Sequence, residues 1–365
     1  MKIGTATAPL HNGKAPAWLF KRMKALAGAI VSAIVVEFGT VELLRKLSDP
    51  FWFQAFGCTI GFDWHSSGLT TTLTGAIKEG LRGMESELGL FVAGGKGKAS
   101  RKTPEEIKIY GDREGIEADS LIYASRITAK VDNSAVQDGY QLYHHSIFFD
   151  RSGNWAVVQQ GMNEEQRMAR RYHWLSDTVK CFVEDPHKAV CSDKKGITLN
   201  LVHKDSREAR SLIPELLKRP PEKNLQDLKS LIEGDHLFMP VRHRIKPTLD
   251  IHPERFYRTL LNTYKEEITD FEDLLGLRGI GPKTIRALSL IGELIYGVKP
   301  SYEDPARFSY AVGGKDGTPY PVDRTTYDSV IDIMKKAVES SSVENSEKLK
   351  AIRRLFRFYE GNQNK

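Results

Sequence analysis

The segments QLYHHSIFFD (141–150) and NWAVVQQGMN (154–163) are two apolar and aromatic runs joined by RSG (151–153). Both runs are rich in residues that favour strands, and the polar segment between them has the length of a tight turn. The sequence therefore predicts a β-hairpin, and with it a mixed α/β core. Because side chains alternate between the two faces of a strand, His144 and His145 should lie on opposite faces.

Upstream of this hairpin, an apolar segment at 21–39 follows a cluster of basic residues. Its apolar positions recur every three or four residues, as on one face of a helix. The run is too short to span a bilayer, and the long proline-containing segment before it is unlike a signal peptide. We expect a buried helix and a soluble, cytoplasmic protein.

Other N-terminal segments have their own patterns. Pro50 should end the first helical run, and SSGLTTTLTGAIKEGL (66–81) is typical of a second helix. LIYASRITAKV (121–131) is rich in strand formers. AGGKGKASRKTPEE (93–106) has the composition of a flexible basic loop that leads into a helix. Lys96 and Lys98 of this loop are candidate contacts to a DNA backbone.

The C-terminal half has a different pattern. RPPEKN (219–224) is polar and proline-broken, and helical periodicity dominates beyond it, apart from a glycine-rich segment at 300–321. We therefore expect a mixed α/β domain over 1–205, which would hold the catalytic or base-binding groups. An all-helical DNA-binding domain should follow over 206–365.

Within this helical half, TDFEDLLGLRGIGPKTIRAL (269–288) predicts a helix, a tight turn and a second helix. Asp270 can cap the first helix. Gly279 and Gly281 allow the turn and the close approach of another backbone, and Pro282 suits the first position of the second helix. Ile285, Leu288 and Ile295 should share one face of that helix.

The start of the second helix is suited to anion binding. Backbone N–H groups of its first turn, which includes Lys283 and Thr284, can bind a phosphate oxygen with help from the helix dipole. The pattern over 270–296 resembles the helix-hairpin-helix motif of DNA-repair and recombination proteins, which implies contact with backbone phosphates rather than bases. The alternative is an ordinary helical hairpin packed into a core.

A second resemblance concerns catalysis. Base-excision glycosylases with this motif place an aspartate beyond the second helix, in a context similar to PVDRTTYDSVI (321–331), which would make Asp323 the catalytic carboxylate. Such a carboxylate stabilises positive charge on the sugar. Bifunctional members carry a lysine nucleophile where Lys283 falls here. Asp323 follows Lys283 by 40 positions, further than in typical glycosylases. Asp323 could instead cap a helix, and Lys283 could simply contact phosphate.

The strands supply another set of candidates. Lys130 and Asp132 precede the hairpin, and His145, Asp150 and Gln160 belong to it. The histidine and the carboxylates among them could hold Mg²⁺ or Mn²⁺ for phosphodiester cleavage, or the set could line a pocket for a flipped base. Ordinary alternatives exist, because a strand histidine is often a hydrogen-bonded core residue and an aspartate before a turn favours that turn. The three cysteines have no zinc-ligand spacing.

Several segments of the chain resemble a single family. They are KIGTATAPLHNGKAPAWLF, DPFWFQAFGC, GFDWHSSG, VDNSAVQDGYQLYHHSIFFD, GNWAVVQQGMN and RRYHWLSD. These segments are similar to domain-of-unknown-function family seven hundred and sixty-three of archaea and some bacteria. The resemblance covers nearly the whole chain and implies no activity.

These features favour a DNA-repair enzyme that acts on damaged or structured DNA, as a lesion-directed glycosylase, a nuclease or both. The net charge of +6 is compatible with such a partner. One alternative is a non-catalytic binder of branched or single-stranded nucleic acid. Another is an RNA-directed or unrelated enzyme with a purely structural hairpin. A nuclease would need the divalent metal, whereas no membrane and no partner protein is implied.

Overall fold

The computed structural model describes residues 17–62, 68–192, 194–233, 251–308 and most of 332–355. The labelled helices are α1 (Ala17–Ser48), α2 (Pro50–Thr59), α3 (Gly68–Gly80), α4 (Glu85–Leu88), α5 (Lys98–Arg101), α6 (Thr103–Glu114), α7 (Ala118–Lys130), α8 (Arg207–Lys218), α9 (Pro221–Glu233), α10 (Pro253–Thr263), α11 (Phe271–Gly276) and α12 (Pro282–Tyr296). The strands are β1 (Leu90–Lys96), β2 (Val136–Gln137), β3 (Gln141–Asp150), β4 (Trp155–Asn163), β5 (Met168–Leu175), β6 (Ala189–Cys191) and β7 (Leu199–Asn200). Short helical turns are η1 (Val131–Ala135, π-helical), η2 (Ser176–Thr178) and η3 (Lys204–Ser206).

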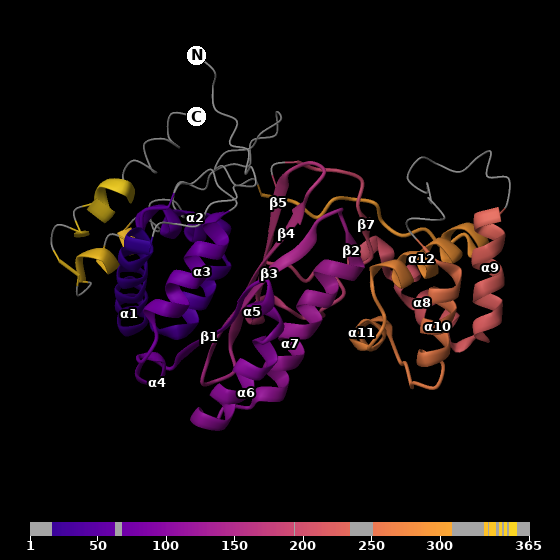
Figure 1. The fold of residues 1–365 in the computed structure, drawn as a ribbon, viewed down its shortest axis with the longest axis horizontal. Helices are drawn as coiled ribbons and strands as arrows, with labels where there is room; N and C mark the ends of the chain where they lie inside the picture. The colour runs from indigo at the N-terminus through magenta and orange to yellow at the C-terminus, as the bar shows by residue number, and fades with distance from the viewer. Residues whose placement is uncertain are drawn as a thin grey trace, which may run out of the picture.

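An antiparallel sheet of five strands, in the order β1-β3-β4-β5-β6, forms the centre of the described structure (Figure 1). The predicted hairpin is confirmed as β3 and β4, whose register pairs His145 with Gln159 and His144 with Gln160. Strands β2 and β7 form a separate two-stranded ribbon.

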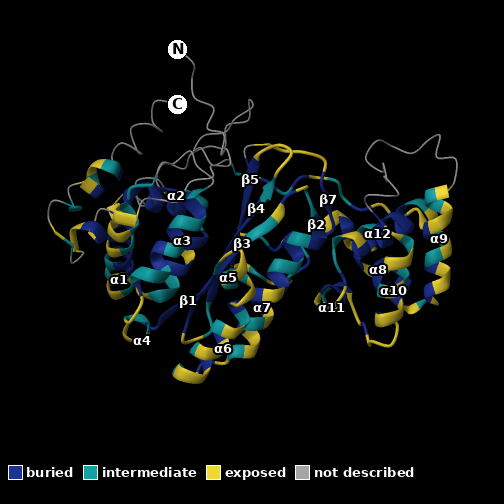
Figure 2. Ribbon diagram, in the orientation of Figure 1, coloured by how far each residue is buried: buried dark blue, intermediate teal, exposed yellow. Residues whose placement is uncertain are grey.

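The sheet divides the apolar interior into two cores. On one face, Phe148, Val158 and Leu175 pack with α1, α2 and α3. On the other face, Phe149 and Val157 belong to an apolar cluster that includes α6 and α7 and continues into the helices from α8 to α12. Figure 2 shows the strands dark blue between helices whose outer sides are teal and yellow. This arrangement follows from the period of two in each strand, because both faces carry apolar side chains.

The helix expected within 21–39 is present as part of α1, and its Met23, Ile30 and Ile34 are buried. Helices α1 and α3 cross closely, because a Cβ atom on Gly28 would lie 2.5 Å from the carbonyl oxygen of Gly80. By length and composition alone, α1 is also long and apolar enough to cross a membrane. Its end at Ser48 agrees with the predicted break, since Asp49 caps α2 and Pro50 begins it.

Two predictions for the region before the hairpin were wrong. Residues 121–131 form most of α7 rather than a strand. Glu117 caps this helix, and its buried positions Leu121, Ala124 and Thr128 have helical spacing, which outweighs the strand propensity of the segment. Residues 93–106 are not a flexible loop, because they form the end of β1, all of α5 and the start of α6, although the helix predicted at the end of this segment is present from Thr103.

The C-terminal region is helical from α8 to α12, as expected. Ile285 and Leu288 are buried, but Ile295 is 43% exposed and does not share their environment. After α12 the chain returns to the first half, where Ser301 pairs with Asn200 and Phe308 pairs with Cys191. The glycine-rich segment predicted at 300–321 lies mostly outside the described residues.

Candidate functional site

The turn between α11 and α12 has the local features that its sequence predicts. Asp270 caps α11 by accepting a hydrogen bond from the Asp273 amide, at 2.9 Å. Gly279 has a φ of 94°, a left-handed conformation that strains other residues. Gly281 is extended, at φ −138°, and a Cβ there would meet no atom within 4 Å. Conformation therefore favours glycine at position 279 only.

Residues from the first half of the sequence hold the α11–α12 turn in place through hydrogen bonds. The Lys130 ammonium, at the end of α7, donates to the carbonyl oxygens of Leu277 (3.2 Å) and Ile280 (2.8 Å). The Gln137 side chain donates to the Pro282 carbonyl at 2.8 Å. Partial burial lowers the pKa of Lys130. In this arrangement Lys130 supports the turn.

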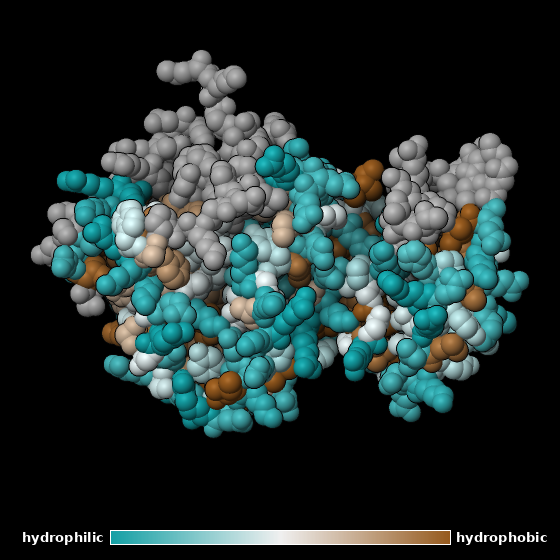
Figure 3. Space-filling model, viewed as in Figure 1, coloured by the Kyte–Doolittle hydropathy of each residue, from teal (hydrophilic) through white to brown (hydrophobic). Residues whose placement is uncertain are grey.

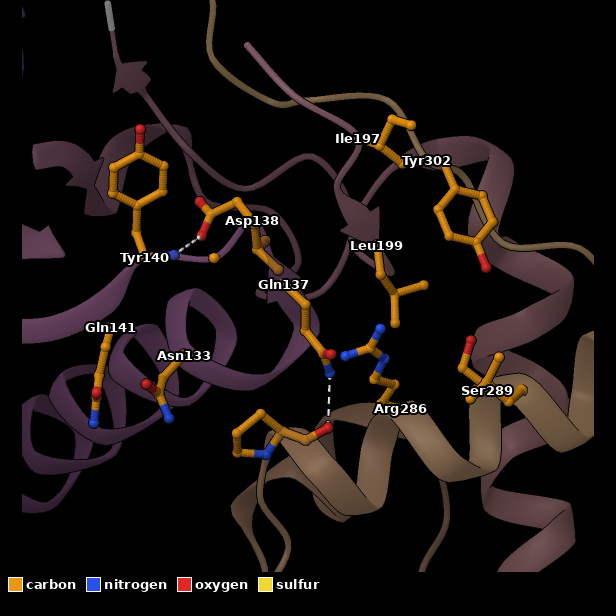
Figure 4. Close-up of a pocket in the computed structure, with 14 residues that line it drawn as sticks. Asn133, Gln137, Asp138, Tyr140, Gln141, Ile197, Leu199, Arg286, Ser289 and Tyr302 are labelled. Atoms are coloured by element: carbon orange, nitrogen blue, oxygen red, sulfur yellow. Dashed lines mark hydrogen bonds between the residues drawn. The ribbon is translucent and has the colours of Figure 1, made fainter. Parts of the chain in front are cut away.

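A cavity of about 390 Å³ opens between η1–β2 and helix α12. This volume is within the range of roughly 300–1,000 Å³ that is typical of small-molecule sites. The lining residues are Asn133, Val136, Gln137, Asp138, Gly139, Tyr140, Gln141, Ile197, Leu199, Pro282, Arg286, Ser289, Leu290 and Tyr302. Figure 4 shows the Arg286 guanidinium and the Gln137 carboxamide pointing into the same space.

Some polar groups around the cavity already have hydrogen-bond or ion-pair partners among the described residues, and others do not. Asp138 is bound by Arg170 at 2.8 Å and by the Tyr172 hydroxyl at 2.6 Å. In contrast, the side chains of Asn133 and Arg286 make no hydrogen bond or ion pair within the described part of the chain. Arg286 is the basic group best placed to receive an anionic or polar ligand here.

Two of the predicted catalytic residues, Asp132 and His145, meet in a buried chain of hydrogen bonds. His145 Nδ1 contacts Gln159 Oε1 at 2.8 Å, and Gln159 Nε2 donates to Asp132 Oδ2 at 2.6 Å. His145 Nε2 contacts the Ser125 hydroxyl at 2.8 Å. Burial lowers the pKa of His145. These side chains are therefore joined, but His145 itself is an interior residue.

Gln160 lies on the opposite face of the sheet from His145. Its Nε2 donates to the Tyr143 hydroxyl at 2.5 Å. On the same face His144 Nε2 contacts the Thr74 hydroxyl at 3.0 Å, and burial lowers the pKa of His144 to about 3. The sheet thus separates Gln160 from the hydrogen-bonded residues Asp132, Gln159 and His145.

Asp150 ends β3 and organises the β3–β4 turn. Its carboxylate accepts hydrogen bonds from the amides of Ser152 (2.9 Å) and Asn154 (3.0 Å) and from the Thr40 hydroxyl (2.9 Å). These contacts match the turn role that aspartate commonly has. Asp150 therefore does not join the hydrogen-bonded residues Asp132, Gln159 and His145.

The remaining predicted residues are scattered. Lys96 ends β1 with its ammonium 5.7 Å from the Tyr143 ring centre, and Lys98 begins α5. In α12, Lys283 is exposed and Thr284 is buried. Asp323 lies outside the described residues. Within the described part of the chain, no three histidine, cysteine or acidic side chains converge as metal ligands would.

Sequence reasoning missed two side chains that complete these arrangements. His187 Nε2 contacts Asp132 Oδ1 and brings the buried chain near the surface. Arg286 lines the large cavity. His187 lies 55 positions from Asp132, so no local motif marks it. Arg286 had a local signal, because it lies one helical turn after Pro282 in α12.

The comparisons with known proteins identify a family but no activity. No curated protein and no solved structure matches the chain. The family described as protein of unknown function, DUF763, matches residues 4–322, which is most of the sequence. The chain therefore belongs to the DUF763 family.

Proposed function

We propose that this protein is a DNA-repair enzyme that holds the DNA backbone at the α11–α12 turn and receives an extruded base in the adjoining cavity. The observation that carries the proposal is that α12 contributes to both features. Its N-terminus follows the glycine turn, and its Pro282, Arg286 and Ser289 line the cavity. A backbone held at the turn would therefore present its nearest nucleotide to the cavity.

The turn has properties suited to phosphate. In our interpretation it is a helix-hairpin-helix motif, with Gly281 as an N-cap that supplies no side-chain acceptor to the first-turn amides. A helix N-terminus of this kind favours anions. The exposed Arg278 and Lys283 add positive charge beside it. Because Lys130 and Gln137 bind the turn's carbonyl oxygens, they favour an orientation in which its amides face outward.

The cavity has groups that could recognise a base. Tyr140 and Tyr302 are aromatic, and Asn133 and Gln141 carry amides that can bond to a base edge. Enzymes that act on a base extrude it into such a pocket, where stacking and edge hydrogen bonds select it. Figure 3 shows a mostly hydrophilic face with scattered apolar residues, which is compatible with a polar ligand.

For the chemical step we propose base excision with Asp323 as the carboxylate that stabilises the developing sugar cation. This role comes from the sequence context of Asp323. Mutation is therefore its test, and Asp323→Asn should abolish excision while DNA binding persists.

The experiment uses an end-labelled oligonucleotide panel: undamaged, deaminated, oxidised, abasic and branched DNA. Each is incubated with Mg²⁺ or Mn²⁺ and again with EDTA, and is then analysed with and without alkali. Alkali-dependent breaks at one lesion in EDTA would support excision. Metal-dependent cleavage would indicate a nuclease instead. Binding without any product would favour the non-catalytic binder.

Variants test the binding geometry separately. Gly281→Val should weaken binding to all DNA sequences alike, and Lys283→Ala should reduce the salt dependence by about one counterion. Neither change should unfold the protein, since position 281 is extended and open. Arg82→Ala is the matched control, because it removes an exposed charge from the segment between α3 and α4, which Figure 1 shows on the other side of β1 from α11 and α12. Unchanged binding by Gly281→Val and Lys283→Ala would overturn the proposed interface.

A further inference from the structure

The hydrogen bonds that join Ser125, His145, Gln159, Asp132 and His187 form a series that we call the buried Asp132 chain. A second, smaller cavity lies beside His187, at the end of this series nearest the surface. Its volume is about 50 Å³, and its lining residues include His187, Asn200, Lys188, Arg307 and Asp185. A water molecule in liquid occupies about 30 Å³, so the cavity has room for one ordered water and part of a ligand. The α11–α12 turn contributes no lining residue.

Asp132 holds His187 in one orientation. The Asp132 side chain is fully buried, and its Oδ2 accepts hydrogen bonds from Gln159 (2.6 Å) and from the Trp174 indole (2.9 Å). Its Oδ1 contacts His187 Nε2. The Trp174 ring centre lies 4.5 Å from that of His187, which fixes the imidazole plane further.

This contact also sets the position of the proton on His187. A carboxylate only accepts hydrogen bonds, so the His187 nitrogen that faces it, Nε2, carries the hydrogen. The other nitrogen, Nδ1, is then a hydrogen-bond acceptor and can take a proton. A carboxylate that orients an imidazole in this way is the arrangement that general-base catalysis requires.

Asn200 is a buried and fixed part of the cavity lining. The residue is 2% exposed, and its Nδ2 donates to the Glu303 carbonyl at 3.0 Å. Its Oδ1 is buried and has no hydrogen-bond partner in the described part of the chain. Because water does not reach this oxygen, Asn200 shapes the cavity and does not bind its contents.

We propose that His187 and Asp132 form a hydrolytic centre that directs a water molecule at a phosphate diester. His187 Nδ1 accepts a hydrogen bond from the water, which leaves an oxygen lone pair for attack. Asp132 acts as a positioning residue. Two cationic side chains, Lys188 and Arg307, and the anionic Asp185 give the cavity lining one net positive charge. One positive charge complements the single negative charge of a diester.

The step conserves atoms and charge. The water oxygen bonds to phosphorus, and its proton passes to His187 Nδ1. The ester P–O bond breaks, and its electrons remain on the leaving oxygen, which takes a proton from solvent. The imidazolium then releases its proton to solvent, so one water molecule is consumed for each ester bond.

The test uses the full-length protein and three chromogenic probes: bis(4-nitrophenyl) phosphate, 4-nitrophenyl phosphate and 4-nitrophenyl acetate. The diester should be hydrolysed fastest. His187→Gln should lower kcat by about 100-fold or more, as expected for the loss of a general base. Lys188→Ala and Arg307→Ala should raise KM with little change in kcat. Arg82→Ala should leave both constants unchanged.

Chemical rescue separates catalysis from folding. His187→Ala opens space beside Asp132, so added imidazole should restore hydrolysis. The double variant His187→Ala/Asp132→Asn should not be rescued, because nothing then orients the imidazole. Absence of diester hydrolysis, preference for the acetate, or full activity in His187→Gln would overturn the proposal. These probes need no contact with the α11–α12 turn, so their result is independent of DNA binding.

Discussion

The buried Asp132 chain and the cavity beside α12 differ in how their polar groups are satisfied. In the chain, Asp132 alone binds Gln159, Trp174 and His187. Beside α12, the Arg286 guanidinium faces a cavity and makes no hydrogen bond or ion pair within the described residues. Asp132 and its partners are thus held by one another, whereas the Arg286 guanidinium in α12 is available to a ligand.

This contrast predicts different consequences of mutation. Changes in the buried chain should lower stability, because they leave polar groups unsatisfied in the interior. Changes to the exposed side chains of the cavity and the turn should alter ligand binding with little loss of stability, because few contacts are lost there.

The largest effect is expected for Asp132→Ala. It removes the acceptor of three buried N–H groups, so the free energy of unfolding should fall by about 3–5 kcal/mol. Urea denaturation measures this difference. Asp119→Ala, an exposed aspartate of α7, is the control and should change stability by less than about 0.5 kcal/mol. Similar effects of both changes would contradict the assignment of Asp132 as a buried acceptor.

The next effect is a dependence of stability on pH. Burial lowers the pKa of His144 to about 3, so between pH 6.5 and 3 the unfolded chain binds a proton that the folded protein does not. Stability should therefore fall with decreasing pH in this window, by up to about 1.4 kcal/mol per pH unit for this histidine.

The comparison of wild type with His144→Gln isolates this contribution. Urea denaturation at pH 7, 6 and 5 should give a shallower decline for the variant, with a difference of about 2 kcal/mol between pH 7 and 5. Parallel declines would mean that His144 is accessible to protons in the folded state.

A smaller effect separates the two glycines of the turn. Gly279→Ala should cost about 1–2 kcal/mol, because alanine is strained at its φ of 94°. Gly281→Ala should cost less, about 0.5 kcal/mol, since position 281 is extended and open and alanine loses only the modest advantage of glycine as an N-cap. Thermal unfolding of the two variants measures the difference, and equal costs would contradict this geometry of the turn.

The smallest effect on stability is expected for Arg286→Ala. Its side chain has no partner among the described residues, so unfolding should change by less than about 0.5 kcal/mol. Binding of DNA should nevertheless weaken, as a filter-binding titration would measure. The outcome that contradicts the proposed ligand cavity is a marked loss of stability with unchanged affinity.

Sequence patterns alone predicted much of the local structure. The strands β3 and β4, the cap at Asp270 and the start of α12 at Pro282 follow from alternation, turn chemistry and capping, which all act over a few residues. Composition misled where tertiary packing prevailed. Residues 121–131 are rich in strand formers, yet their spacing suits a helix that packs on the sheet.

Only the tertiary structure decided which polar residues meet. Alternation already predicted that His144 and His145 lie on opposite faces, but only the strand register pairs His145 with Gln159 and His144 with Gln160. His187 reaches Asp132 across 55 positions, and Lys130 reaches Ile280 across 150. Periodicity reports the face on which a residue lies, whereas the identity of its partner depends on how separate elements pack. The sequence thus determined the hairpin and the glycine turn, and packing determined the two candidate sites.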